Sequence, residues 1–247
     1  MKFLGSLVFT VLLFLTTAVF GVIVLACAWL PIHARYAIPR AWAHSLFAML
    51  EVLCRLDYTV EGREHLPKEP FISMWKHSST WDTIAQMLVV PPAAWIVKRE
   101  VIWIPIVGWA VATFRPIAIN RSAGGSAVKQ VVAQGRKRFA EGLGVLIYPE
   151  GTRMAPGETR KYGVSGALLA TQTGRLVVPI AHNSGYFWRR RGLMKYPGTI
   201  RVVIGPPIDP AGLDPREVNE RAQRWIETTV AEIVGRPGGR PTAFEPT

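Results

Sequence analysis

The stretch PFISMWKHSSTWD, residues 70–82, decides how this chain folds and where its chemistry lies. Its first half is an apolar run that ends at Trp75 and is typical of a buried strand. Residues 78–80 are Ser, Ser and Thr, which favour the N-cap position of a helix. The sequence therefore predicts a strand over residues 70–75 that leads through a short loop into a helix over about 80–90.

His77 and Asp82 follow this strand in an H-x-x-x-x-D arrangement. A histidine oriented by a carboxylate is the usual means of taking a proton from a hydroxyl. Five residues along a regular helix rotate a side chain by about 140°, so the two side chains could not meet on one helix. They can meet only if His77 lies on the loop and Asp82 in the first turn of the helix. Taken alone, such a pair arises often by chance, and most are surface or core polar residues.

Three further apolar runs end in polar residues. Ligand sites in α/β proteins gather at the carboxyl ends of strands, and Arg is suited to binding phosphate. For the run at 145–148 taken alone, a strand-ending turn with a surface salt bridge is the simpler interpretation. The run at 114–119 leads to Arg121, the run at 145–148 leads to Glu150, Gly151, Thr152 and Arg153, and the run at 176–181 ends at His182.

The order of these motifs resembles the glycerophospholipid acyltransferase family, and within it the bacterial 1-acylglycerol-3-phosphate acyltransferases. The resemblance covers roughly residues 60 to 210 and includes Lys98-Arg99-Glu100, ahead of the second motif. Two positions depart from the family pattern. Lys76 stands where the family often has Asn, and Asn120 stands where it often has Asp.

The resemblance implies transfer of an acyl chain from a thioester, acyl-CoA or acyl carrier protein, to the sn-2 hydroxyl of 1-acylglycerol-3-phosphate. The product is phosphatidic acid for phospholipid synthesis. His77 would act as general base, and Asp82 would fix its tautomer and stabilise the imidazolium. No cofactor and no metal are expected, since the thioester is itself a substrate.

The resemblance also implies which residues bind substrate. Arg121 and Arg153 would hold the acceptor phosphate, with Lys98 as a further candidate. Backbone N–H groups near Gly151, in the loop that includes Thr152, are candidate donors to the oxyanion. Glu150 would either bind the acceptor or position Arg153.

Three alternatives stay open at this point. The acceptor could be another lysolipid, such as lyso-ornithine lipid. A serine hydrolase needs a G-x-S-x-G elbow, and residues 163–167 lack the final Gly. The third alternative is a membrane-anchored basic protein that binds lipid or nucleic acid. It would explain the positive net charge and the apolar N-terminal segment, but not the order of the motifs.

The N-terminus and the charge point to a membrane. Phe3–Leu30 contains no charged residue and is long enough to cross a bilayer core of about 30 Å. It is also longer than the apolar region of a signal peptide. Residues 40–56 predict an amphipathic helix, so a single span and a hairpin in one leaflet are both open. The net charge of +12 suits an anionic surface. We expect the bacterial inner membrane, a catalytic domain facing the cytoplasm, membrane lipids as partners and no nucleic acid.

Strands that alternate with helices predict an α/β fold with a mixed, mostly parallel sheet flanked by helices, preceded by a membrane-associated two-helix segment. We expect anchoring helices over 1–57, the acyltransferase domain over 58–235 and a disordered tail over 236–247. Within the domain, the apolar segment 101–114 favours a core helix over a lipid-facing one. Cys27 and Cys54 indicate neither a disulfide framework nor a zinc site.

Overall fold

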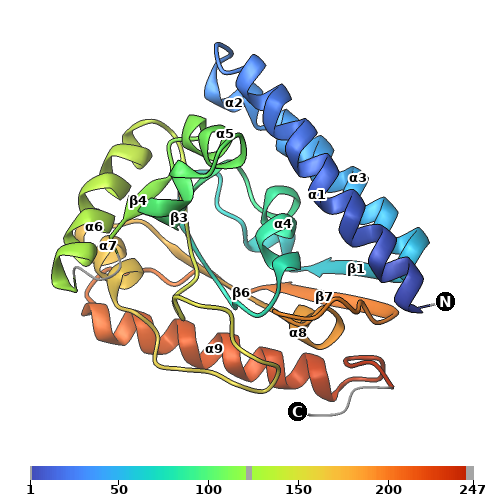
Figure 1. The fold of residues 1–247 in the computed structure, drawn as a ribbon. Helices are drawn as coiled ribbons and strands as arrows, with labels where there is room; N and C mark the ends of the chain where they lie inside the picture. The colour runs from blue at the N-terminus through green and yellow to red at the C-terminus, as the bar shows by residue number, and fades with distance from the viewer. Residues whose placement is uncertain (1, 121–123, 243–247) are drawn as a thin grey trace.

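The computed structural model describes residues 2–120 and 124–242 (Figure 1). Seven strands form one sheet in the order β1-β7-β6-β2-β5-β3-β4. Every neighbouring pair is parallel except β6 and β7, so the predicted mixed, mostly parallel α/β fold is confirmed. The strands are β1 Leu56–Glu61, β2 Ile72–Trp75, β3 Ala93–Lys98, β4 Ile117–Ile119, β5 Gly144–Ile147, β6 Val177–His182 and β7 Gly198–Ile204.

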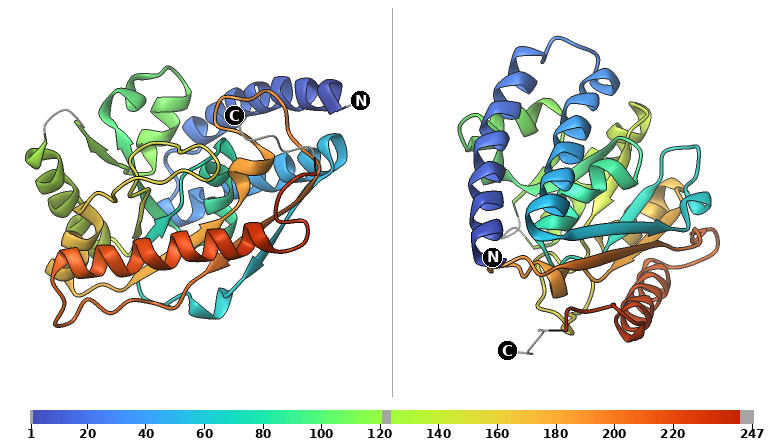
Figure 2. Two further views of the ribbon diagram at one scale, coloured as in Figure 1. Left: turned by 90° about the horizontal axis from the view of Figure 1, so that it is seen from below. Right: turned by 90° about the vertical axis from the view of Figure 1, so that its right-hand side faces the viewer.

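Helices cover both faces of this sheet (Figures 1 and 2). The first face is packed by α3 and α4, with α1 lying against α3. The opposite face is packed by α6, α7 and α9. The helices are α1 Lys2–Ala26, α2 Ile32–Arg35, α3 Ala37–Cys54, α4 Thr80–Val89, α5 Val107–Thr113, α6 Gly125–Ala140, α7 Ser165–Thr173, α8 Ser184–Phe187 and α9 Pro215–Gly235, with short 3-10 helices η1 Arg63–His65 and η2 Arg99–Trp103.

The alternation of side chains along β2 sets the two sides of the site. Met74 packs in the core beneath α6, α7 and α9, whereas Trp75 packs in the core beneath α3 and α4. Successive side chains of an extended strand point to opposite faces. The Lys76 side chain therefore points toward α9, and the His77 side chain points toward α4.

The two N-terminal helices are part of the folded domain. Within the described residues, α1 is the one helix long and apolar enough to cross a membrane, with a mean hydropathy of 2.7. It lies antiparallel to α3 (Figure 1). On α3, Phe47 stacks on Trp81 of α4 with ring centroids 5.3 Å apart, and Leu46 and Leu50 are fully buried. Residues 37–54 thus complete the core of the α/β domain as well as supporting α1.

The segment at 101–114 differs from its prediction. The structure divides it into η2 and α5, with Pro105 and a positive φ of 62° at Ile106 between them. Proline lacks the N–H that a continuous helix needs. Trp103 and Trp109 are 61% and 52% exposed, so the predicted core helix is wrong for these side chains.

Residues 236–242 also differ from their prediction. They fold back over the end of the sheet, where Asn183 Nδ2 donates to Gly239 O at 2.7 Å and Arg201 donates to Pro237 O at 3.1 Å. The expected disorder rested on the Pro and Gly content of the tail. Composition does not reveal these hydrogen bonds between residues far apart in the sequence. Positions 243–247 lie outside the described residues.

Candidate active site

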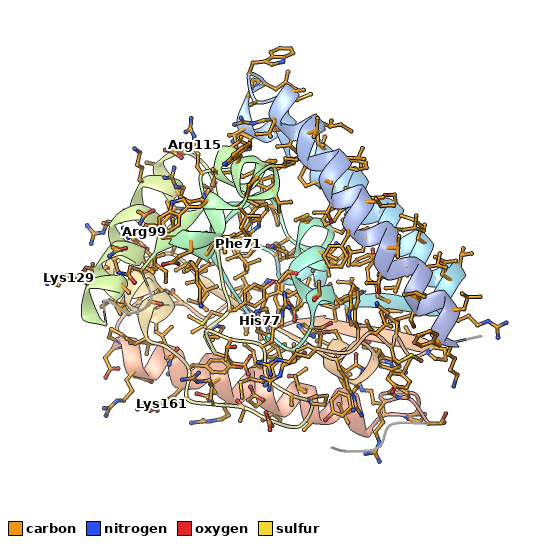
Figure 3. All side chains as sticks on the ribbon, in the orientation of Figure 1. Phe71, His77, Arg99, Arg115, Lys129 and Lys161 are labelled. Carbon is orange, nitrogen blue, oxygen red and sulfur yellow. The ribbon has the colours of Figure 1, made fainter. Side chains whose placement is uncertain are left out.

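His77, labelled in Figure 3, lies just past the carboxyl end of β2. Asp82 contacts it there. His77 Nδ1 lies 3.0 Å from Asp82 Oδ1, and the other carboxylate oxygen accepts from the backbone N–H groups of Ser78 and Ser79 at 2.9 and 2.8 Å. Ser79 is the N-cap of α4, and its side chain accepts from Trp81 N at 3.1 Å. Asp82 therefore lies in the first helical turn, as the spacing required.

This hydrogen-bond pattern determines which nitrogen of His77 can act as a base. Asp82 accepts at both oxygens, so Nδ1 of His77 is the donor and Nε2 carries the lone pair. The imidazole stacks on the Tyr148 ring with centroids 4.0 Å apart. Its side chain is 13% exposed, so a substrate can reach it while the protein holds its orientation.

Electrostatics keep Asp82 ionised although it is completely buried. Burial alone would raise its pKa, but His77 and the backbone N–H of Ser78 outweigh this effect and hold the pKa below its usual range. Beside it, burial and the Asp82 charge raise the pKa of Tyr148 well above its usual range. Tyr148 is therefore a neutral wall of the site, and its hydroxyl donates to Asp82 O at 3.1 Å.

Glu150 contacts the loop that carries His77. Its side chain is fully buried, with Oε2 accepting from the backbone N–H of His77 and Oε1 from Lys76 Nζ, both at 2.7 Å. Burial raises the pKa of Glu150, and the Lys76 ammonium opposes that rise. Both carboxylate oxygens are thus occupied by the residues around His77.

His182, the polar residue at the end of the run 176–181, is a second histidine in the site. Its Nε2 donates to Lys76 O at 2.8 Å, and its Nδ1 accepts from Ser184 N at 3.3 Å. Donating at one nitrogen and accepting at the other defines a neutral ring. Burial lowers the pKa of His182, consistent with that state. These two contacts of His182 fix the backbone at Lys76 and Ser184.

The loop after β5 brings Arg153 to the His77 side of the sheet. Gly151 turns the chain with φ of 69°, and its N–H donates to Tyr148 O at 2.9 Å, so this N–H is engaged within the turn. Thr152 is exposed and Arg153 is half-buried. The Arg153 charge opposes the rise in the pKa of Tyr148, the residue on which His77 stacks. Arg190 donates to Arg153 O at 2.7 Å and supports the loop.

The remaining predicted residues lie further along the same edge of the sheet. Lys98 is exposed at the end of β3 and is paired with Ile119 of β4. Since β5 separates β3 from β2, Lys98 is roughly 10 Å of sheet width from the strand that carries His77. Arg121 follows the end of β4 by two positions and lies outside the described residues. Within the described residues, no group of three His, Cys, Asp or Glu side chains could hold a metal ion.

Comparisons with known proteins agree with this geometry. Residues 57–183 match the acyltransferase family model. The chain is 41% identical over 208 residues to a 1-acyl-sn-glycerol-3-phosphate acyltransferase of Pseudomonas aeruginosa, covering 83% of this chain and 81% of that protein. It is 29% identical over 198 residues to the human 1-acyl-sn-glycerol-3-phosphate acyltransferase alpha, covering 77% and 70%.

A solved structure shares the fold. The crystal structure of the 1-acyl-sn-glycerophosphate (LPA) acyltransferase from Thermotoga maritima matches with a TM-score of 0.79 at 22% identity, covering 96% of this chain and 97% of that one. The fold and these comparisons define an acyl-transfer protein, whose described residues include one N-terminal helix long and apolar enough to cross a membrane. The chain belongs to the acyltransferase family, and the resemblance drawn from its motifs is confirmed.

Proposed function

We propose that this protein transfers an acyl chain from a thioester to the sn-2 hydroxyl of 1-acylglycerol-3-phosphate, with His77 as general base. It is a lysophosphatidic acid acyltransferase that forms phosphatidic acid. The observation that carries the proposed mechanism is the His77–Asp82 pair, in which Asp82 binds Nδ1 of a partly exposed imidazole.

The mechanism follows from the orientation of the imidazole. Nε2 of His77 takes the proton of the acceptor hydroxyl as its oxygen attacks the thioester carbonyl. The Asp82 carboxylate, 3.0 Å from Nδ1, stabilises the imidazolium that forms. The tetrahedral intermediate then collapses, the C–S bond breaks, and the imidazolium returns its proton to the thiolate. The substrate hydroxyl thus occupies the position that a serine holds in a hydrolase.

Glu150 positions the base in this proposal. A charge-assisted hydrogen bond from a backbone N–H to a buried carboxylate is stronger than a neutral one. His77 is held by such a bond at its amide, while its carbonyl accepts from Met154 N at 2.8 Å. The imidazole therefore rests on a backbone that is fixed on both sides.

Acceptor profiling tests the function. Purified protein in detergent should acylate 1-acylglycerol-3-phosphate and discriminate against lyso-ornithine lipid, which lacks the phosphate. Each acceptor would be offered with acyl-CoA and with acyl carrier protein thioester, and products would be read by mass spectrometry. Faster acylation of lyso-ornithine lipid would exclude phosphate-directed recognition.

Arg153→Ala is expected to raise the KM for lysophosphatidate about 10–100-fold, because the phosphate loses a charge-assisted partner. Arg121→Ala should act in the same direction. Steady-state kinetics with each substrate varied in turn would measure the effect, with Arg160→Ala, an exposed arginine of the same loop, as the control. A rise confined to the KM of the thioester would place these arginines on the donor instead.

We further propose that α1 lies in one leaflet of the inner membrane, on the cytoplasmic side. Its 25 residues are about 37 Å long, but both ends are held by the domain. Near the start, Ser6 Oγ accepts from Lys195 N at 2.9 Å. Near the end, Gly21 lies against Ile106, and Val24 packs in a core cluster with Phe114. A helix held along its whole length favours an orientation parallel to the domain surface over a perpendicular span.

The membrane-facing surface in this arrangement extends beyond α1. Trp103, Ile104 and Trp109 are 61%, 49% and 52% exposed, and α5 packs beside α1. Tryptophan is typical of membrane interfaces. The exposed apolar residues of α1 are Phe3, Leu4, Leu7, Val8, Val11, Phe14, Leu15, Val19, Val22 and Ile23.

The triple variant Trp103→Ser, Ile104→Ser, Trp109→Ser should weaken binding to liposomes at least about 10-fold, since each buried apolar side chain contributes about 1.5–3 kcal/mol. Liposome flotation in about 1 M salt, which shortens the Debye length to about 3 Å, would isolate this apolar contribution from charge attraction. The control is Val164→Ser, an exposed apolar residue before α7 on the opposite face. Equal flotation of the triple variant and the control would show that residues 103–109 do not contact the membrane.

A further inference from the structure

A buried ion pair joins Lys76 to Glu227 of α9, on the face of the sheet opposite His77. Lys76 Nζ lies 2.9 and 3.1 Å from the two carboxylate oxygens of Glu227. The Lys76 side chain is only 5% exposed, whereas lysine normally keeps its ammonium in water. Burial of this kind is costly unless every donor is satisfied.

Every donor of the ammonium has an acceptor. Besides Glu227, Lys76 Nζ donates to Glu150 Oε1 at 2.7 Å and to Glu158 O at 3.0 Å. An ammonium has three N–H donors, and the three groups use them all. Glu227 is itself held by the Tyr162 hydroxyl, which donates to it at 2.8 Å. The cluster is thus fully connected rather than an incidental contact.

Glu150 connects this cluster to His77. Lys76 and His77 are neighbours in sequence, but strand alternation sends their side chains to opposite faces. One oxygen of Glu150 binds the Lys76 ammonium and the other binds the His77 amide. A continuous chain of hydrogen bonds therefore runs from Glu227 of α9 through Lys76 and Glu150 to the backbone N–H of His77.

The charge balance of the cluster depends on Lys76. Glu150 and Glu227 each lie within hydrogen-bond distance of the same Nζ, so one cation serves two carboxylates. Burial raises the pKa of Glu150, Lys76 opposes the rise and Glu227 adds to it. Tyr162, in the loop before α7, His182, at the end of β6, and Tyr186, on α8, are titratable groups that face this cluster. The charged residues Glu158 and Arg240 line the same cavity as Lys76 and Glu227.

We propose that Lys76 is a positioning residue for acyl transfer, which keeps Glu150 ionised on the His77 amide while Glu227 holds the ammonium in place. The inference rests on the proposed role of His77 as the base. It gives a use to the position where this chain carries Lys instead of the Asn common in the family.

A cavity of about 430 Å³ borders the cluster on the α9 side. Its walls include Lys76, Glu227, Tyr186, Val230 and Arg240. The Glu227 side chain is 25% exposed, so water and protons can reach the cluster without passing the His77 side. The protonation state of Glu150 can therefore follow the bulk pH, and its effect on kcat can be measured in a pH series.

Lys76→Gln should lower kcat about 10–100-fold at neutral pH, with little change in either KM, because Glu150 becomes protonated and its bond to the His77 amide loses its charge. The acid limb of the kcat profile should move to higher pH, since the pKa of Glu150 is then raised by burial and by Glu227 without a cation to oppose them. A pH series of kcat on purified protein in detergent would show both effects.

The second substitution gives the sharper test. Adding Glu227→Gln to Lys76→Gln removes the carboxylate that repels Glu150, so it should recover kcat roughly 3- to 10-fold and return the acid limb toward its original position. The matched control adds Glu220→Gln, an exposed glutamate two turns earlier on α9, and should recover nothing. Lys76→Arg, which keeps the charge, should retain the original acid limb and covers the case that Lys76→Gln fails to fold.

Four results would overturn the inference. Lys76→Gln could lose activity equally at every pH, the Glu227→Gln addition could lower activity further, or Lys76→Arg could shift the acid limb. The fourth is a raised KM for lysophosphatidate in Lys76→Gln, which would make Lys76 a substrate ligand. If any of these occurred while His77→Ala stayed inactive, the role of His77 would stand and only the role of Lys76 would fall.

Discussion

Replacement of His77 by Ala is expected to lower kcat/KM for lysophosphatidate acylation about 10²–10⁴-fold, the range typical for loss of a general base. The loss should fall on kcat, because the imidazole acts on the proton of the bound acceptor and does not hold its phosphate. Steady-state kinetics on detergent-purified protein would measure it. The fold should survive, since the His77 side chain is partly exposed and its backbone bonds to Glu150 and Met154 do not need the ring.

The matched control is His44→Ala, an exposed histidine of α3 in the same chain. It should keep the original kinetics. Thermal unfolding of both variants would separate lost chemistry from lost structure. Near-normal turnover by a folded His77→Ala protein would contradict the mechanism.

Asp82→Asn is expected to be nearly as damaging, about 10³–10⁴-fold in kcat, for a different reason. The amide oxygen of Asn must face the two backbone N–H groups of Ser78 and Ser79, which need an acceptor. Its NH₂ group then points to His77 Nδ1 and donates where the carboxylate accepted. The imidazole must move its proton to Nε2, so the nitrogen facing the substrate no longer carries a lone pair.

This reasoning separates Asp82→Asn from Asp82→Ala. The Asn variant keeps the bonds that cap α4, so its thermal stability should stay close to the original. The Ala variant leaves two buried N–H groups without acceptors, at a cost of about 1–3 kcal/mol each in unfolding free energy. Both variants should be inactive, and only Ala should unfold early. Substantial kcat in a folded Asp82→Asn protein would show that the tautomer is not what Asp82 provides.

Local patterns were sufficient to predict the framework of the site. The central strands β2, β5 and β6 appear in the sequence as short apolar runs, because buried parallel strands carry apolar residues on both faces. The spacing of His77 and Asp82 required a loop followed by a helical first turn, and the structure has this arrangement. Glu150 and Arg153 were placed at the neighbouring strand end by the same argument, and β5 does lie beside β2.

Contacts between distant parts of the chain could not be predicted in this way. Glu227 is 151 positions from Lys76, and a glutamate within a helical segment gives no sign in the sequence of a buried lysine opposite it. The exposure of Trp103 and Trp109 depends on how η2 and α5 pack beside the rest of the protein, and the periodicity of the sequence does not report this packing. The described end of the chain is held by Asn183 through a backbone carbonyl, a contact that leaves no trace in residue type.

The central claim is that the acyl chain passes directly from the thioester to the lysolipid hydroxyl under the control of His77. The most direct measurement is intact-protein mass spectrometry after incubation with an isotope-labelled acyl thioester, with and without lysophosphatidate. The account predicts an unchanged protein mass in both samples and label in phosphatidic acid only when the acceptor is present. A protein that gains the mass of the acyl chain and passes the label to lysophosphatidate added later would contradict it.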